Sequence, residues 1–326
     1  MKKTFLLLVV ALLSLNTFAQ SDMAKLLEAG VKDANTLAKP YLEPYGEMLG
    51  SSLNNGWYNS AKQHKLLGFD VTITATYIKA PSSATTFDIG KYSDKLETYE
   101  LSDPNVSITP TVAGEMDERP VLKPQGLPGG TPADFTMPNG TGMDYLPIPM
   151  VTAGVGLPFG FELKGRFTPE VTIGDAGSLG LWGIGIQKDL KDYIPAVKHV
   201  PVLNVSVLAA YTSFSSEIEV EEAASDGRLD ISASGITTRL IVGANLPVVA
   251  FYGGVGYGKS TSNFNLMGTY NVGISQETDP IKLGYATNSF DANVGMRIRL
   301  GVIALHADYT LGEYSAITAG LGISFR

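Results

Sequence analysis

Three groups of residues in this sequence have types and spacings that chemistry could use. The run 253–260 reads Gly-Gly-Val-Gly-Tyr-Gly-Lys-Ser and matches the pattern of a phosphate-binding loop. Such a loop works when a helix follows it, because the backbone N–H groups of the loop and the helix start then surround a phosphate. Residues 261–265 do not begin an amphipathic helix, and the alternating glycines are typical of the small-residue face of a strand. We therefore expect a strand here and no nucleotide site.

The histidines form the second group. His64, His199 and His306 are the only ones and are isolated in the sequence, so a metal site would need companions brought by folding. His306 and Asp308 share one face of a predicted strand, and Ser324 on the neighbouring strand is a conceivable nucleophile. Outer-membrane phospholipases use a Ser and a His that face lipid, whereas His306 falls on the polar face. We predict no catalytic, cofactor-binding or metal-binding residue, and an enzyme remains a third alternative.

Charged residues form the third group. Glu217, Glu219, Glu221 and Glu222 could bind divalent cations together with lipopolysaccharide, but a solvated loop rim is the simpler interpretation. Other charges fall on the polar face of predicted strands, because facing lipid would cost a basic residue roughly 2–4 kcal/mol near the midplane. The candidates for the interior are Asp70, Glu162, Lys164, Arg166, Arg239, Arg297, Arg299, His306 and Asp308. A bracing network and a constriction that selects anionic or amphipathic solutes are both open interpretations.

Strands must position these residues. From Asp291 onward, apolar residues such as Val294, Leu305 and Leu321 share one face of three successive segments. Gly, Ser, Thr, Asn and a few charges occupy the other face, which suits the interior of a barrel whose apolar face meets lipid. The chain closes with Phe325 and one further residue, an ending that resembles those of outer-membrane barrels.

The first 20 residues have the pattern of a secretory signal. Lys2 and Lys3 precede an apolar stretch over 5–15, and small residues follow at 17–19. The absence of cysteine excludes disulfides, thiol nucleophiles and a lipid-bearing Cys. Without the two signal lysines, 22 of the 24 basic residues remain against 32 acidic ones, so we expect no nucleic-acid partner. No apolar stretch is uninterrupted enough to span a membrane as a helix, which leaves a closed barrel as the membrane-spanning option.

The chain divides into a signal peptide at 1–20, an N-terminal helical plug or periplasmic segment at 21–67, and a barrel at 68–326. Apolar residues over 22–52 recur at spacings of three and four and are interrupted at Pro40 and Pro44, which predicts two short amphipathic helices. Residues 68–78 form the first predicted strand, and nine more follow Pro149. The loop-rich insertion at 79–147 could extend outside the cell, fold into the lumen or add one hairpin.

Four runs of this sequence resemble a known family. They are Leu-Asn-Asn-Gly-Trp-Tyr-Asn at 53–59, His-Lys-Leu-Leu-Gly-Phe-Asp at 64–70, the Pro- and Gly-containing run 147–158, and Arg-Phe-Thr-Pro at 166–169. They resemble an uncharacterised Bacteroidota family of secreted, barrel-predicted proteins, which brings no functional residue with it. The layout is more distantly similar to outer-membrane transporters of long-chain fatty acids and aromatic hydrocarbons. Those proteins place an N-terminal helical plug in a 14-stranded barrel.

The sequence therefore predicts an all-β fold: a transmembrane antiparallel β-barrel of 10–12 strands, with 14 as an alternative, and a short N-terminal helical plug. The predicted location is the bacterial outer membrane, with its lipid, lipopolysaccharide and the barrel assembly machinery as partners. The leading function is passive uptake of a small solute, for which a hydrophobic molecule is one option. The alternative is a non-transporting structural or interaction barrel, such as a surface or secretion-system component.

The predicted N-terminal helices need a surface inside the barrel to pack against. The apolar stripe over 22–52 needs a partner surface, since burying one Leu side chain contributes roughly 1.5–3 kcal/mol. We expect the helices to occlude the barrel from its periplasmic end. Their acidic residues Glu28, Glu43 and Glu47 are expected to face Arg239, Arg297 and Arg299.

Overall fold

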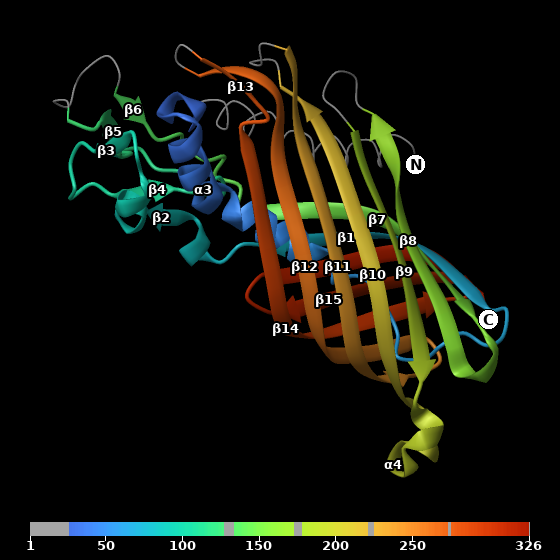
Figure 1. Cartoon of the computed structure of the whole chain (residues 1–326). Helices are drawn as coiled ribbons and strands as arrows, with labels where there is room; N and C mark the ends of the chain where they lie inside the picture. Colours follow the sequence, from blue (N-terminus) through green and yellow to red (C-terminus); the bar gives the residue numbers. More distant parts are fainter. Residues whose placement is uncertain (1–25, 127–133, 173–177, 221–224, 273–274, 326) are drawn as a thin grey trace.

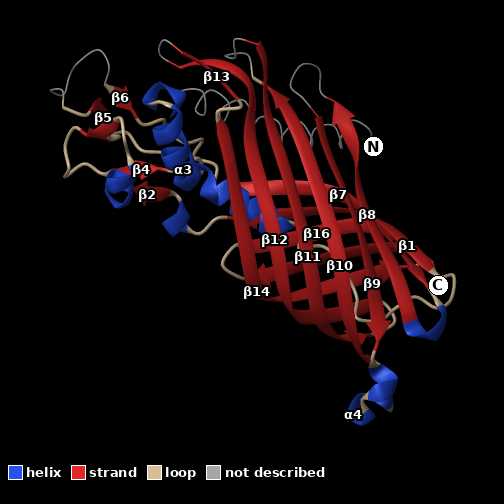
Figure 2. Ribbon diagram, viewed as in Figure 1, coloured by secondary structure: helices blue, strands red, loops and turns tan. Residues whose placement is uncertain are grey.

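The computed structural model describes residues 26–126, 134–172, 178–220, 225–272 and 275–325, so the predicted signal, Glu221 and Glu222 lie outside the described part. Within it, ten antiparallel strands close into a barrel (Figure 2). The strands are β1 (Phe69–Lys79), β7 (Tyr145–Gly156), β8 (Phe161–Thr172), β9 (Ser178–Asp189), β10 (Leu203–Glu219), β11 (Ser225–Asn245), β12 (Val249–Val272), β14 (Ile281–Leu300), β15 (Ile303–Leu311) and β16 (Ser315–Phe325). Consecutive strands of this series pair with each other, and β1 closes the barrel on β16 with Ile73 opposite Leu321.

The two ends of the barrel differ. Residues 157–160, 246–248 and 301–302 make tight connections at one end, which we call the short-turn end. The connection 190–202 at that end contains η6 (Lys191–Tyr193) and α4 (Pro195–Lys198), which project from the barrel (Figure 1). The opposite end, which we call the long-loop end, carries the insertion between β1 and β7 and the connection with β13 (Ser275–Thr278), which extends the sheet by pairing with β12, although 312–314 between β15 and β16 is short. Short turns at one end and longer loops at the other are typical of outer-membrane barrels.

The helical segment enters the barrel from the long-loop end. After η1 (Leu27–Ala29), one helix, α3 (Val31–Ser52), runs beside β14 and β12 and then down into the lumen (Figure 1). Its buried apolar residues include Leu37, Tyr41 and Met48. Residues 53–66 continue through the lumen to the short-turn end and lead into β1. The segment was predicted to occlude the barrel from the periplasmic end, where outer-membrane barrels have their short turns, and the structure instead places α3 at the long-loop end.

The two predicted helices are also wrong, because α3 continues through Pro40 and Pro44. Each proline removes one backbone donor from the helix. Neighbouring elements bind helix carbonyls from outside: the Tyr285 hydroxyl donates to the Lys39 oxygen at 2.9 Å and the Val112 N–H to the Tyr41 oxygen at 2.9 Å. Tertiary packing therefore outweighs the local interruption.

The insertion covers the upper half of α3. It contains η2 (Ser82–Ala84), η3 (Ile89–Lys95) and two small sheets, β2 (Thr86–Asp88) with β4 (Ile108–Pro110), and β3 (Tyr99–Leu101) with β5 (Val121–Pro124) and β6 (Phe135–Thr136). The Asp33 carboxylate in the first turn of α3 accepts the backbone N–H groups of Glu97, Thr98 and Tyr99 at 2.8–2.9 Å. Of the three predicted placements, the structure shows an extension at the long-loop end.

The barrel wall has two zones that differ in which face of each strand is apolar. We call the part near the short-turn end the lower zone and the part near the long-loop end the upper zone. Near the short-turn end β11 points Leu240 and Val242 outward and Thr237 and Arg239 inward. Near the long-loop end the same strand points Ser232 outward, and the inward positions become apolar, as on the neighbouring strands. Inward apolar residues of this upper zone include Leu229, Ile218, Phe264, Leu266 and Leu283, which form one core with α3. The lower zone therefore has an apolar exterior, and the upper zone has an apolar interior.

The predicted strand faces and strand count agree with this barrel. On β14, β15 and β16 the apolar partners of each alternation are exposed, and the polar partners lie mostly inside. The ten barrel strands fall within the predicted ten to twelve. The run 253–260 lies within β12, so the strand expected there is confirmed.

Gly46 provides a test of how α3 is seated. A Cβ on this residue would lie 2.5 Å from the Tyr285 ring of β14, so a larger side chain must push the helix away from the wall. We predict that Gly46→Val lowers the free energy of unfolding by about 1–3 kcal/mol through overpacking and raises protease cleavage within α3.

The control is Glu43→Val, one turn earlier in the same helix, where the side chain is exposed. Thermal unfolding and limited proteolysis in detergent measure both effects. Equal effects of the two substitutions would contradict close contact between α3 and β14.

Candidate functional site

Arginines of the barrel wall bind the backbone of the lumen segment 53–59. Arg166 donates to the carbonyl oxygens of Leu53 and of Asn55, the latter at 2.8 Å, and its guanidinium lies 4.2 Å from the ring centre of Trp57. Arg239 donates to the Asn54 oxygen at 3.2 Å. Backbone carbonyls buried away from water need donors, and these arginines supply them.

Arg239 has a further partner in the wall, and a third arginine, Arg297, also reaches the lumen segment. Arg239 forms a buried ion pair with Asp291, and the pair crosses the backbone of Gly256, where a Cβ would lie 2.7 Å from the arginine Cγ. Arg297 donates to the Asn59 side-chain oxygen at 3.0 Å. The wall and the lumen segment are therefore tied together along the lower zone.

The nine predicted interior residues lie on the inward face of their strands, and eight of them are buried. The exception is Arg299, which is exposed at the short-turn rim. Asp308 accepts from the Tyr252 hydroxyl at 3.0 Å and from the Asn293 amide at 3.4 Å. His306 is buried beside Gly320 of β16, opposite Arg297.

The expected acidic partners of the arginines are not where they were predicted. Glu43 is exposed, Glu47 accepts a hydrogen bond from Tyr314, and the side chain of Glu28 lies outside the described part. Burial raises the pKa of the Glu47 carboxyl above its ordinary value. The described arginines inside the barrel instead bind lumen-segment oxygens and Asp291.

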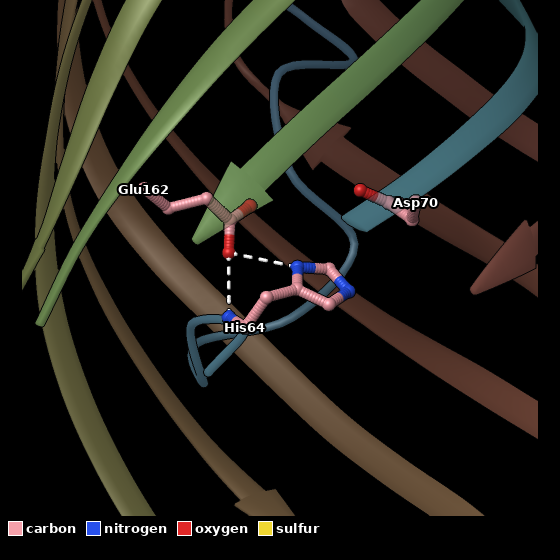
Figure 3. A group of neighbouring side chains, drawn as sticks. All are labelled: His64, Asp70 and Glu162. Atoms are coloured by element: carbon pink, nitrogen blue, oxygen red, sulfur yellow. Dashed lines mark hydrogen bonds and ion pairs between the residues drawn. The ribbon is translucent and has the colours of Figure 1, made fainter. Parts of the chain in front are cut away.

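A second cluster lies at the short-turn end (Figure 3). His64 donates its backbone N–H to Glu162 Oε2 at 2.8 Å, and its Nδ1 lies 2.9 Å from the same oxygen. Its Nε2 lies 3.2 Å from Ser324 Oγ. The other Glu162 oxygen binds Lys164. Ser324 therefore contacts His64, and the suggested pairing of Ser324 with His306 is wrong.

The same cluster has the residue types of a metal site. Ligand atoms of His64, Asp70 and Glu162 lie within 4.8 Å of one another. However, Ser324 occupies His64 Nε2 and the Lys164 ammonium already balances the charge of Glu162. A divalent cation would have to displace both contacts, so the arrangement fits a hydrogen-bonded network better.

An apolar chamber of about 90 Å³ lies in the upper zone, between α3 and the wall formed by β7 to β12. Its lining includes Leu42 and Leu49 of α3, Leu181 of β9, Leu229 of β11 and Phe264 of β12. Among the described residues that line it, none is charged. The chamber is therefore suited to an uncharged apolar molecule.

Polar groups of the chamber are already paired within the protein. The Thr168 hydroxyl donates to the Pro149 oxygen at 2.8 Å, and the Ser216 hydroxyl to the Ser178 oxygen at 2.9 Å. The Tyr45 hydroxyl lies 2.8 Å from that of Thr141. The chamber therefore offers a ligand apolar contacts but few polar groups that are free to form hydrogen bonds.

A basic vestibule of about 480 Å³ opens at the short-turn end. Lys62, His64, Lys65, Arg297 and Arg299 line it, together with apolar residues of the β9–β10 and β11–β12 connections. No acidic residue belongs to the described lining. The chamber and the vestibule are separated by the packed lumen segment 53–59.

Sequence reasoning missed the chamber and the roles of His64 and Ser324. The chamber lies in the upper zone, where the inward positions of the strands become apolar, and the alternating pattern alone does not mark this reversal. His64, Glu162 and Ser324 come from three distant segments, and the pairings of β1 with β7 and β16 and of β7 with β8 bring them together.

Comparison with known proteins places the chain in a family. The model described as "Family of unknown function (DUF6588)" matches residues 1–325. The chain belongs to this family. The resemblance to an uncharacterised barrel family is thus confirmed, whereas the Bacteroidota origin stays a prediction. No curated protein matches the chain significantly.

Solved structures similar to this DUF6588 member are β-barrel proteins. The beta domain of the Bordetella autotransporter BrkA is 10% identical, covers 79% of this chain and 100% of its own, and gives a TM-score of 0.36. The Ralstonia pickettii toluene transporter TbuX is 8% identical, covers 87% of this chain and 99% of its own, and gives a TM-score of 0.27. The Escherichia coli outer membrane protease OmpT is 10% identical, covers 79% of this chain and 97% of its own, and gives a TM-score of 0.29. Likenesses this low carry no inference about function.

Among the described helices, none is both long and apolar enough to cross a membrane.

Arg166 provides a test of how the lumen segment is held. Arg166→Leu removes the donors to Leu53 and Asn55, and each hydrogen bond to a charged group contributes roughly 1.5–3 kcal/mol. We predict that Trp57 becomes more accessible to acrylamide, measured by fluorescence in a Trp182→Phe background that leaves Trp57 as the one tryptophan of two.

Arg228→Leu is the control, because Arg228 forms an exposed ion pair with Asp230 on the outer face of β11. Such surface pairs contribute about 0–1 kcal/mol. Unchanged quenching in the Arg166 variant would mean that the arginine does not hold the segment.

Proposed function

We propose that this protein is an outer-membrane barrel that takes up a small, uncharged, apolar solute. The apolar chamber between α3 and β7–β12 is the observation that carries the proposal. The apolar exterior of the lower zone, the chemistry of the chamber and the position of the lumen segment support it.

The exterior of the lower zone has the form of a lipid-facing belt. It runs from Ile236 on β11 to Leu246, the residue directly after that strand. About ten residues at roughly 3.3 Å each, tilted by about 40°, give a height of roughly 25 Å. Aromatic pairs lie at its edges, with Phe69 stacked on Phe325 at 5.1 Å on the short-turn side. On the long-loop side Trp182 packs against Tyr211 at 5.6 Å. Aromatic girdles at both interfaces are typical of transmembrane barrels.

A matched pair of substitutions on β11 tests this belt. Leu240 and Ser232 both point outward, but only Leu240 lies inside the belt. We predict that Leu240→Arg destabilises the barrel in lipid vesicles by about 2–4 kcal/mol, whereas Ser232→Arg has little effect. Folding yield and heat-modifiable gel mobility measure the difference, and equal effects would argue against lipid contact at this height.

The chamber favours a solute without charge or strong hydrogen-bonding groups. Removing apolar surface from water contributes about 25 cal/mol per Å², whereas burying an unpaired carboxylate costs far more. Because the chamber's hydroxyls bind protein carbonyls or each other, a neutral hydrocarbon-like molecule fits and its carboxylate analogue does not.

The position of the lumen segment implies gated passage. Residues 53–59 lie directly below the chamber and are bound by Arg166 and Arg239. A solute leaving toward the vestibule must therefore displace this segment. The proposed movement is passive, driven by the solute gradient.

The filled lumen supports a second candidate, a structural or interaction barrel that transports nothing. In that case the insertion at 79–147 would be the interacting part, and outer-membrane lipid and lipopolysaccharide would be the surrounding partners. Uptake measurements distinguish the two candidates.

Toluene and benzoate form a matched pair of probes. Ile231 is half-buried at the chamber wall, and Ile231→Trp fills the space, whereas Ser232→Trp adds the same side chain to the outer face. We predict saturable toluene binding and uptake by vesicles containing the wild type and the Ser232 variant, at least about tenfold weaker binding by the Ile231 variant, and no saturable benzoate binding.

Toluene binding that is unaffected by Ile231→Trp would place the solute elsewhere. Binding without uptake would favour the non-transporting barrel.

A further inference from the structure

Three side chains at the short-turn end have the geometry of a nucleophile, a base and an orienting carboxylate. Ser324 Oγ lies 3.2 Å from His64 Nε2, and His64 Nδ1 lies 2.9 Å from Glu162 Oε2. An ionised carboxylate only accepts hydrogen bonds, so Glu162 fixes the proton on Nδ1 and leaves Nε2 free to accept the Ser324 proton. This order of contacts defines a catalytic triad irrespective of chain order.

The other contacts of the Glu162 carboxylate do not prevent it from orienting the His64 imidazole. Glu162 Oε1 binds Lys164, while Oε2 accepts both the backbone N–H and the ring Nδ1 of His64. Glu162 is buried and points inward from β8. Lys164 therefore compensates the buried charge without competing for the oxygen that orients the imidazole.

Ser324 and His64 both line the basic vestibule, so a soluble molecule can approach them. Two other residues of this lining have buried polar atoms without partners: Arg297 at Nε and Nη2, and Gln63 at both atoms of its amide. Both side chains are more than nine-tenths buried. These unpaired donors line the same vestibule as Ser324, and a developing oxyanion requires such donors.

We propose that Ser324, His64 and Glu162 form a hydrolytic site for small carboxylic esters that carry an anionic group. The serine oxygen attacks the ester carbonyl and its proton passes to His64 Nε2. The bond to the alkoxy group then breaks, and the same proton leaves with the alcohol. Water attacks the acyl-serine, gives a proton to His64 and releases the acid, while the proton returns to Ser324.

The vestibule selects the substrate class. Lys62, Lys65 and Arg299 are exposed around its mouth and attract an anionic group, and apolar residues such as Val202 and Val248 receive a short acyl chain. The site lies at the opposite end of the lumen from the apolar chamber. It does not depend on uptake, and loss of toluene binding leaves it untouched.

Covalent labelling tests the nucleophile directly. The full mature chain, folded in detergent, is treated with a fluorophosphonate probe, and the modified peptide is identified by mass spectrometry. We expect labelling at Ser324, its loss in Ser324→Ala, and strong reduction in His64→Gln. The control is Ser206→Ala, which removes a buried lumen hydroxyl that accepts a hydrogen bond from the Gln187 amide.

Hydrolysis of mono-4-nitrophenyl succinate and 4-nitrophenyl acetate tests turnover and selectivity. We expect a higher kcat/KM for the succinate, a fall of at least about 10³-fold in Ser324→Ala, and a preference reduced by Arg299→Gln. Glu162→Gln should lower kcat with little change in KM, because Glu162 acts through His64. Heat-modifiable mobility confirms that each variant is folded.

Three outcomes overturn the proposal: no labelling of the folded wild type, labelling that persists in Ser324→Ala, or equal hydrolysis by wild type and Ser324→Ala. If His64→Gln fails to fold, the smaller Ser324→Ala substitution decides the question alone.

Discussion

The structure depends on one constraint: a length of irregular backbone crosses the inside of a closed barrel and must find hydrogen-bond partners there. Residues 53–59 are not part of a helix or a strand, so their carbonyls have no partners within the segment. Arg166 and Arg239 supply the donors, Asp291 balances one of the two charges, and Gly256 leaves room for that pair. The charges inside this barrel are therefore explained first as supports for the chain they enclose.

The same constraint divides the interior into two chemically different halves. Where the chain is irregular, the wall is polar and charged. Where the chain is helical, most of its backbone groups are paired within α3. Few donors from the wall are then needed, such as the hydroxyls of Tyr285 and Ser262, and most of the wall can be apolar. Leu229 and Phe264 can therefore point inward at the level of α3, where a guanidinium such as that of Arg239 would find few unpaired carbonyls to bind. An apolar chamber above and a basic vestibule below follow from the conformation of the segment between them.

The sequence predicts the barrel well because a strand repeats every two residues. Val294 and Leu305 alternate with polar residues over enough length to define both the strands and their faces. Pro40 and Pro44 misled the helix prediction, since their local effect is outweighed by packing that only the folded barrel supplies. The reversal between Leu240 and Ser232 was invisible, because alternation gives the faces of a strand but not its height in the barrel.

The interior residues differ in how far the sequence could place them. A charge on a predicted strand, such as Arg166, is assigned to the lumen because the other face meets apolar surroundings. Its partner is the backbone of Leu53, and no residue type signals a carbonyl. The contacts of His64 with Glu162 and Ser324 depend on the pairings of β1 with β7 and β16 and of β7 with β8, which no local pattern contains.

The lumen segment is joined to the rest of the molecule at both of its ends. Below, it leads into β1, which forms the seam with β16; above, α3 is fastened to the insertion through Asp33. A segment held in this way cannot leave the barrel as a free stopper. With both ends fixed, the segment can move only if the chain between these ends stretches or bends. That happens where the backbone hydrogen bonds are fewest. Pro40 and Pro44 each lack the donor of a helical bond, so they make this part of α3 the natural place for such slack.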